Sequence, residues 1–160
     1  MNISNIKQFL VEKLNIDTNI IENSLQPLLQ VKVNDLIQVA TFLHENEHTY
    51  FDMLSCITAI DNGKTLNSID VVYNLYSIPF NLSISLSVSI ERNSNDGVPS
   101  LSHIWKTAEW HEREAYDLVG IKFKNHPDLR RILLPNNWDG HPLQKDYSLQ
   151  EKYHGIKVKY

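Results

Sequence analysis

Residues 69–91, IDVVYNLYSIPFNLSISLSVSIE, decide the fold of this chain. From Leu82 to Ile90 an aliphatic residue alternates with a serine at every step. Successive side chains of a strand point to opposite faces, so this pattern predicts a strand with one aliphatic face and one hydroxyl face. Residues 69–77 predict a second strand, and we expect it to pair antiparallel with 82–91.

The serine face of the predicted strand lacks the Lys and Glu residues expected of a freely solvated surface. Two interpretations stay open: a loop or another chain covers this face, or the face is exposed and merely uncharged. Residues 71–90 also carry no charge over 20 positions, which is the length of a membrane span. Two asparagines, five serines and Pro79 in that stretch would be costly in lipid, so we expect a soluble chain.

Upstream of these strands, helical periodicity marks the start of the chain. Apolar residues recur there at three- and four-residue steps, which predicts a helix containing Ile3, Ile6, Leu10 and Leu14. Residues 28–33 predict a short strand. Asn34 is a suitable N-cap for a second helix, whose apolar stripe is Leu36, Val39, Ala40 and Leu43. The apolar run 50–60 fits a helix or a strand, and it closes at the turn signal 61–63.

Downstream of the strands, residues 101–119 predict a helix, in one piece or two, with Gly120 at its C-cap. From residue 122 onward periodicity disappears, although large apolar residues remain frequent. A free disordered tail would not contain so many of them. We therefore expect an α+β two-layer domain with a mixed, mostly antiparallel sheet packed on helices over residues 1–121. Residues 122–160 would form a long irregular C-terminal extension of the same domain that docks on a partner.

Charge and cysteine content narrow the function. Residues 1–121 contain 7 Lys/Arg and 15 Asp/Glu, a net charge of −8, whereas residues 122–160 contain 8 and 4, a net charge of +4. The overall charge of −4 argues against nucleic acid as a partner, and the asymmetry indicates that the two ends face different neighbours. Cys56 is the single cysteine, so the chain contains neither an internal disulfide nor an all-cysteine iron–sulfur site.

Three blocks of sequence suggest a family. They read EREAYDLVGI at 112–121, HPDLRRIL at 126–133 and GHPLQKDY at 140–147. This region closely resembles the signature of the thirty-kilodalton, C-type subunit of respiratory complex I, NADH:quinone oxidoreductase. With weaker matches upstream, the resemblance covers roughly residues 50–160, and three blocks with preserved spacing are far more specific than one short motif.

The resemblance implies an accessory subunit of the peripheral arm of that proton-translocating complex. It implies no flavin, cluster or quinone ligand in this chain; FMN, iron–sulfur clusters and quinone are expected in partner subunits. Those partners would be subunits B, D and I, of which the second binds quinone and the other two hold iron–sulfur clusters, with membrane contact only through the complex. The expected location is the cytoplasmic face of a bacterial inner membrane, or the mitochondrial matrix face. Gln144 and Ser148 stand where the family usually has Arg and Pro, which puts a local partner contact in doubt.

The signature residues permit other interpretations. Taken as a set, they are expected to be structural: Glu112, Arg113, Glu114, Asp117, Gly120, His126 and Pro127. An acid/base or metal site on this helix is the alternative, but Glu112 and Glu114 are two apart and do not face the same way, and no metal-ligand spacing is present. Arg113 is the expected hub of an ion-pair network with Glu109 or Asp117.

The tail provides the candidate docking residues, which are Arg130, Arg131, Trp138, His141, Lys145, Asp146 and Tyr147. For the two arginines an ion pair across a subunit interface is favoured over a bound phosphate. Trp105 and Trp110 fit core packing or interface anchoring equally, and Cys56 is expected to be a small buried hydrophobe. Three other functions stay open: the equivalent subunit of a membrane-bound hydrogenase or ferredoxin-linked complex, a stand-alone enzyme using Glu112 and Glu114, and a generic binding module.

Overall fold

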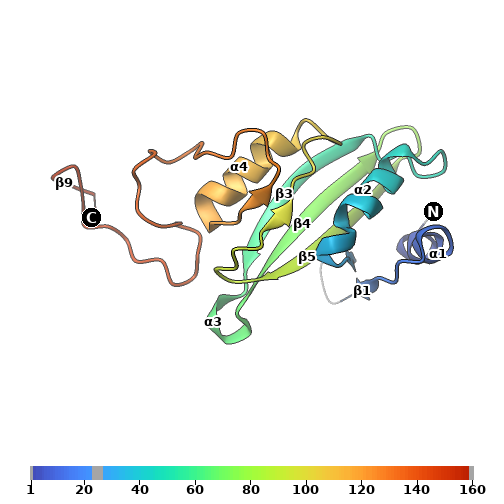
Figure 1. Cartoon of the computed structure of the whole chain (residues 1–160), viewed down its shortest axis with the longest axis horizontal. Helices are drawn as coiled ribbons and strands as arrows, with labels where there is room; N and C mark the ends of the chain where they lie inside the picture. Colours follow the sequence, from blue (N-terminus) through green and yellow to red (C-terminus); the bar gives the residue numbers. More distant parts are fainter. Residues whose placement is uncertain (1, 23–26, 159–160) are drawn as a thin grey trace.

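The structure is a computed structural model that describes residues 2–22 and 27–158 (Figure 1). Its centre is a five-stranded sheet with the order β1-β2-β5-β4-β3. Strand β2 pairs parallel with β5 and the other neighbours pair antiparallel, which confirms the mixed, mostly antiparallel sheet. In chain order the elements are α1 Ile3–Leu14, β1 Asn19–Ile21, β2 Leu28–Gln30, the 3-10 turn η1 Val33–Asp35, α2 Leu36–Glu45, β3 Met53–Asp61, α3 Gly63–Leu66, β4 Ser68–Ser77, β5 Leu82–Glu91, β6 Val98–Pro99, α4 Ala108–Val119, β7 Phe123–Lys124, β8 Lys152–Tyr153 and β9 Ile156–Lys157.

Strands β4 and β5 form the hairpin that the alternating pattern predicts. Their register places Tyr73 opposite Leu86 and Val71 opposite Val88, so both aliphatic rows lie on one face of the sheet. All four of these side chains are fully buried. The uncharged stretch 71–90 is therefore a sheet hairpin, and within the described ranges no helix has the length and apolar character needed to cross a bilayer.

The serine face of β5 is covered at its centre and open at its ends. Ser85 and Ser87 are each 4% exposed, whereas Ser83 and Ser89 are exposed. The central pair lies beside β2, and the Ser85 hydroxyl donates to Oδ1 of Asn74 at 2.6 Å. Hydrogen bonding within the sheet replaces solvation there, so each of the two open interpretations holds for part of the face.

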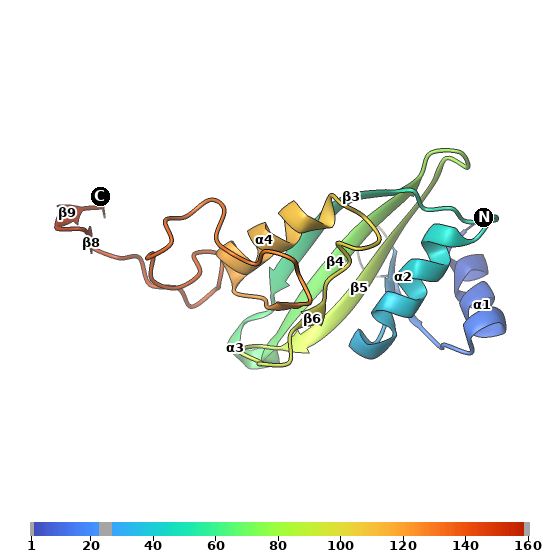
Figure 2. The same ribbon diagram turned by 45° about the horizontal axis from the view of Figure 1, so that its top comes forward.

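Helices α2 and α4 lie across the same face of the sheet in both ribbon views (Figures 1 and 2). Leu36, Val39 and Leu43 of α2 join one core with the aliphatic rows of β4 and β5. Helix α1 packs on α2, with the rings of Phe9 and Phe42 5.2 Å apart. Burying about 25 cal/mol per Å² of apolar surface, this single helix layer stabilises one face of the sheet and gives the predicted two-layer architecture.

Three local predictions differ from the structure. Asn34 lies inside η1 and does not cap α2, which begins at Leu36 without a side-chain cap. Residues 101–107 form turns, because the Leu101 amide is held by Glu112 and the Thr107 hydroxyl by the Leu54 carbonyl; only 108–119 is helical. Tertiary contacts thus override local propensity. Cys56 is half-buried and accepts from Nδ2 of Asn74 at 3.1 Å.

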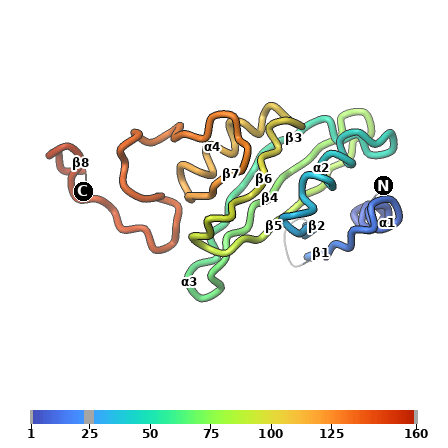
Figure 3. Tube along the Cα trace, in the orientation of Figure 1, coloured from blue at the N-terminus to red at the C-terminus, as the bar shows by residue number. Residues whose placement is uncertain are grey.

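The ambiguous run 50–60 resolves as β3, the edge strand beside β4. Strand β7 pairs with β6, so the body of the domain continues as far as Lys124. Beyond it the chain runs as an irregular tail away from the N-terminal helices (Figure 3). None of the described residues 124–158 is buried, which agrees with the irregular tail expected from the sequence.

Candidate functional site

The first half of the tail is anchored to the C-terminal end of α4, and Asp117 is the centre of this anchor. Its Oδ2 accepts from three consecutive tail amides, those of Ile132 at 3.0 Å, Leu133 at 2.8 Å and Leu134 at 2.9 Å. Its Oδ1 accepts from Nη1 of Arg131 at 2.7 Å. Burial alone would raise the pKa of Asp117, but these four donors outweigh it and hold the pKa below the usual value.

The tail also satisfies the last carbonyls of α4, which an isolated helix leaves without partners. Nδ1 of His141 lies 2.9 Å from the Asp117 carbonyl, so this nitrogen is assigned as the protonated donor. The Leu143 amide donates to the Leu118 carbonyl at 2.9 Å, and Nε2 of Gln144 donates to the Val119 carbonyl at 2.8 Å. The tail therefore acts as the C-cap of α4. Gln144 fills the donor role that the departure from the family pattern had put in doubt.

Arg131 ties the tail to itself as well as to α4. Its Nη2 donates to the carbonyls of Trp138 at 3.0 Å and Gly140 at 2.9 Å. Arg113 donates to the carbonyls of Arg130 at 3.1 Å and Arg131 at 3.2 Å, and its guanidinium lies over the exposed Trp110 ring. The expected hub is therefore wrong in one respect: Asp117, and not Arg113, is the centre, and Arg131 is its ion-pair partner within this chain.

A second anchor joins the tail to the end of the sheet. Arg92, directly after β5, pairs with Asp61 at the end of β3, with Nε 2.8 Å from Oδ1. Arg92 also pairs with Asp146, and the Lys145 amide donates to Oδ2 of Asp61 at 2.8 Å. The amides of Lys145 and Gly63 and the Arg92 charge outweigh the effect of burial and keep the pKa of Asp61 low. The hydrogen bond from Arg92 lowers the pKa of Asp146.

Gly120 permits the close approach of the tail. It ends α4 at φ +86°, and a Cβ on it would lie 2.6 Å from the His141 ring. We expect Gly120→Ala to destabilise the fold by about 2 kcal/mol, because it adds a clash to the strain of a left-handed backbone. Gly155→Ala is the matched control, since Gly155 has φ +80° with nothing within 4 Å. Chemical unfolding measures both, and equal losses would show that the His141 contact contributes nothing.

Beneath the anchor, α4 contains a buried carboxyl group. Glu112 is 0% exposed; its Oε1 accepts from the Leu101 amide at 2.8 Å, whereas Oε2 lacks a partner among the described residues. Nε2 of His126 lies 4.0 Å away and faces the Glu109 carbonyl at 3.0 Å. Burial raises the pKa of Glu112 to about 7. Burial, and then the Glu112 charge, raise the pKa of Tyr73 well above its usual value.

The outer half of the tail makes fewer contacts with the body. Nε1 of Trp138 donates to the Tyr147 hydroxyl at 3.0 Å, and the Trp138 ring lies 5.3 Å from that of Tyr153. Strands β8 and β9 form a small hairpin beyond them. Large apolar side chains of the tail are exposed: Leu133 at 62%, Leu143 at 61%, Leu149 at 68% and Ile156 at 70%.

The structure brings most of the sequence-predicted residues together around these two anchors. Glu114, Pro127 and Arg130 are exposed, with Arg130 paired only to Asp128 at 2.9 Å. Of the tryptophans, Trp105 is in the core and Trp110 is 60% exposed. Sequence reasoning missed Asp61 and Arg92. A signal for them existed, because each is a charged residue at the end of an otherwise apolar or uncharged strand.

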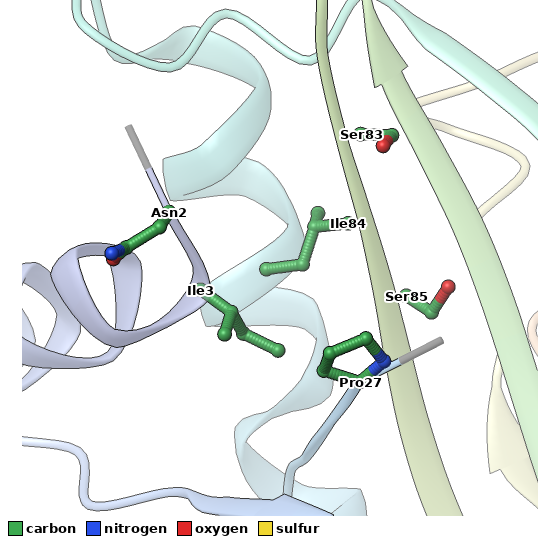
Figure 4. Close-up of a pocket in the computed structure, with 6 residues that line it drawn as sticks. All are labelled: Asn2, Ile3, Pro27, Ser83, Ile84 and Ser85. Atoms are coloured by element: carbon green, nitrogen blue, oxygen red, sulfur yellow. The ribbon is translucent and has the colours of Figure 1, made fainter. Parts of the chain in front are cut away.

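The hollows in the surface lack the features of a catalytic site. A hollow of about 340 Å³ is lined by Asn2, Ile3, Pro27, Ser83, Ile84 and Ser85, none of which titrates near neutral pH (Figure 4). No group of three or more His, Cys, Asp or Glu residues in the described ranges has the geometry of a metal site. Glu112, the group with the shifted pKa, is sealed in the core away from these hollows. The arrangement positions a tail and offers no reacting group to a substrate.

Comparison with known proteins agrees with the signature blocks. The family model described as respiratory-chain NADH dehydrogenase, 30 Kd subunit, matches residues 29–153. The chain is 46% identical over 140 residues to the C-type subunit of NADH-quinone oxidoreductase from Chloroherpeton thalassium, covering 86% of this chain and 57% of that protein. It is 42% identical to the same subunit from Chlorobium phaeobacteroides, covering 86% and 83%, and 39% identical to that from Moorella thermoacetica, covering 88% and 92%.

A solved structure shares the fold. A chain of the membrane-bound sulfane sulfur reductase, an archaeal respiratory membrane complex, superimposes with a TM-score of 0.73 over 91% of this chain and 85% of its own length. The two are 19% identical, so this likeness concerns the fold alone. The predicted α+β class is thus confirmed both by the strand topology and by a solved relative in fold.

Proposed function

The chain belongs to the family of the 30 kDa subunit of respiratory-chain NADH dehydrogenase, and from that membership we propose that it is an accessory subunit of the peripheral arm of a proton-translocating NADH:quinone oxidoreductase. In this role it contains no cofactor. Its neighbours would be the quinone-binding subunit and the two iron–sulfur subunits named above, and FMN, clusters and quinone would reside in the partners. It would lie on the cytoplasmic face of a bacterial inner membrane, held there by the complex.

The observation on which this function rests is the tail itself. Its inner half is fixed to α4 and the sheet by Asp117 and Arg92, yet its outer half exposes four large aliphatic side chains between Leu133 and Ile156. An apolar surface on an ordered segment indicates a protein interface. The body thus presents a preorganised docking element, which lowers the entropic cost of association.

The anchors refine which tail residues are available to a partner. Arg131 is consumed by Asp117 and two tail carbonyls, so reversing its charge would damage the fold before it tested docking. Arg130, Lys145 and Tyr147 remain candidates for partner contacts, as do the exposed aliphatic residues. The sharper test therefore uses the aliphatic residues.

We expect Leu149→Asp together with Ile156→Asp to lower recovery of the chain with the complex by at least about tenfold, because two buried aliphatic contacts are replaced by desolvated charges. Affinity purification from detergent-solubilised membranes measures this. Leu66→Asp is the matched control, a leucine 70% exposed on α3. Full recovery of the double variant with an active complex would contradict the docking role, and an unchanged unfolding midpoint would show that the body remains folded.

Two alternatives receive less support. The equivalent subunit of a hydrogenase or ferredoxin-linked complex shares the fold, but the relatives compared above are NADH-quinone oxidoreductase subunits. For a stand-alone enzyme, Glu112 is inaccessible in the core and Glu114 lies on the opposite, exposed side. Those two carboxylates do not form one acid/base pair.

A further inference from the structure

The sheet has one open edge that lacks the usual protection. Strand β3 pairs with β4 on one side, and no strand in the described ranges pairs with it on the other. The opposite edge, β1, is three residues long, whereas β3 spans nine. Natural proteins protect long edges with lysine, proline or a covering element, because unpaired amides and carbonyls attract another strand. From Met53 to Ile60 the strand contains no charged residue and no proline.

A groove runs along this edge. It has a volume of about 280 Å³, and its floor contains four consecutive residues of β3, Cys56 to Ala59. Neighbouring residues of a strand point to opposite faces, so a hollow that touches all four lies against the edge itself. Across residues 2–22 and 27–158, the backbone of 55–60 makes no hydrogen bond outside the β4 ladder. The edge is therefore free to pair.

The opposite wall of the groove is formed by α4 and the tail. Ala115, Leu118 and Leu143 make it apolar, and Leu143 is 61% exposed. Glu114 stands at the rim, exposed, and has no ion-pair partner in the described part of the chain. Backbone pairing at the edge, an apolar wall and an unpaired acid at the rim are the three elements of a strand-addition site.

We propose that an extended segment of a neighbouring subunit adds to β3 as a sixth strand, places an aliphatic side chain against Leu118 and Leu143, and sets a Lys or Arg beside Glu114. This inference rests on the proposed function, which supplies the neighbour. A second copy of this chain fits less well, because a symmetric edge-to-edge pair would bring a second α4 and a second Glu114 to the same rim. The acidic rim selects a basic partner segment.

Amide hydrogen exchange tests the proposal directly. In the assembled complex, the outward-facing amides of residues 55–60 are expected to exchange at least about tenfold more slowly than in the isolated full-length chain. Glu114→Lys is expected to restore fast exchange at these amides, whereas Glu47→Lys, a reversal at an exposed site on the loop before β3, leaves them protected.

Each other result overturns something definite. Outward amides that exchange equally fast in the complex and in the isolated chain overturn the strand addition while leaving the subunit role intact. Protection that grows with the concentration of the isolated chain assigns the edge to a second copy and overturns the proposed partner. A wild-type chain that copurifies with no respiratory complex overturns the proposed function, and this inference with it.

Discussion

Replacing Asp117 with alanine is expected to destabilise the protein by about 4 kcal/mol, the typical cost of removing one partner from a buried ion pair. The change leaves the Arg131 guanidinium without its anion and removes the common acceptor of three amides. Each half-buried donor left unsatisfied adds to the loss. The residues from 131 to 147 should then detach from α4, because their other contacts depend on the geometry that Asp117 imposes.

Urea unfolding of the isolated chain measures this loss, and limited proteolysis reports the release of the tail. Asp128→Ala is the control: Asp128 pairs with Arg130 at the surface, where such a pair is worth less than about 1 kcal/mol. Asp117→Asn separates charge from shape, because the amide can still accept from the three backbone donors. A loss below about 1 kcal/mol for Asp117→Ala would refute the central role of this carboxylate.

The stability of the fold is expected to fall as pH rises from about 4.5 to about 7, by up to about 3 kcal/mol, through the single carboxyl group of Glu112. Burial raises the pKa of this group from its ordinary value of 4.5 to about 7. Over that window the unfolded chain releases the proton while the folded chain keeps it, so the unfolded state gains stability with rising pH. Above the folded pKa the penalty is complete and stays constant.

The surroundings of Glu112 explain why its charge is unwelcome. The Asp128 amide donates to Nδ1 of His126 at 3.0 Å, so Nε2 is assigned as the protonated nitrogen, and it donates to the Glu109 carbonyl. The unpaired carboxylate oxygen of Glu112 therefore gains nothing from this imidazole. The Glu109 charge raises the pKa further, whereas the Ser100 hydroxyl and the Leu101 amide lower it.

Glu112→Gln should remove this pH dependence, since the amide mimics the protonated acid. At pH 5 the variant and the wild type are expected to differ by less than about 1 kcal/mol, and at pH 8 the variant should be the more stable. Unfolding midpoints at pH values from 5 to 8 provide the comparison. Glu114→Gln is the matched control on the exposed side of α4 and should keep the wild-type slope. A Glu112→Gln variant with the wild-type slope would assign the effect to another group.

Local pattern was sufficient wherever one face of an element is buried. The alternation from Leu82 to Ile90 predicted β5 and its partner strand, because a one-residue slip would move every aliphatic side chain out of the core. Gly120 was placed at the end of α4 because a left-handed backbone there favours glycine. Where a boundary depends on tertiary contacts, as at Asn34 and residues 101–107, local pattern failed.

The sequence by itself determined the α+β class, the hairpin, the family and the division into an acidic body and a basic irregular tail, because these follow from periodicity, composition and motif spacing. Only the tertiary structure decided that Asp117 receives Arg131, that Arg92 joins Asp61 to Asp146, and that the edge of β3 stays open. The first two join residues far apart in the chain, at separations of 14, 31 and 54 positions. Hydrogen bonds at such distances leave no periodic trace in the sequence, so folding alone reveals which charges meet.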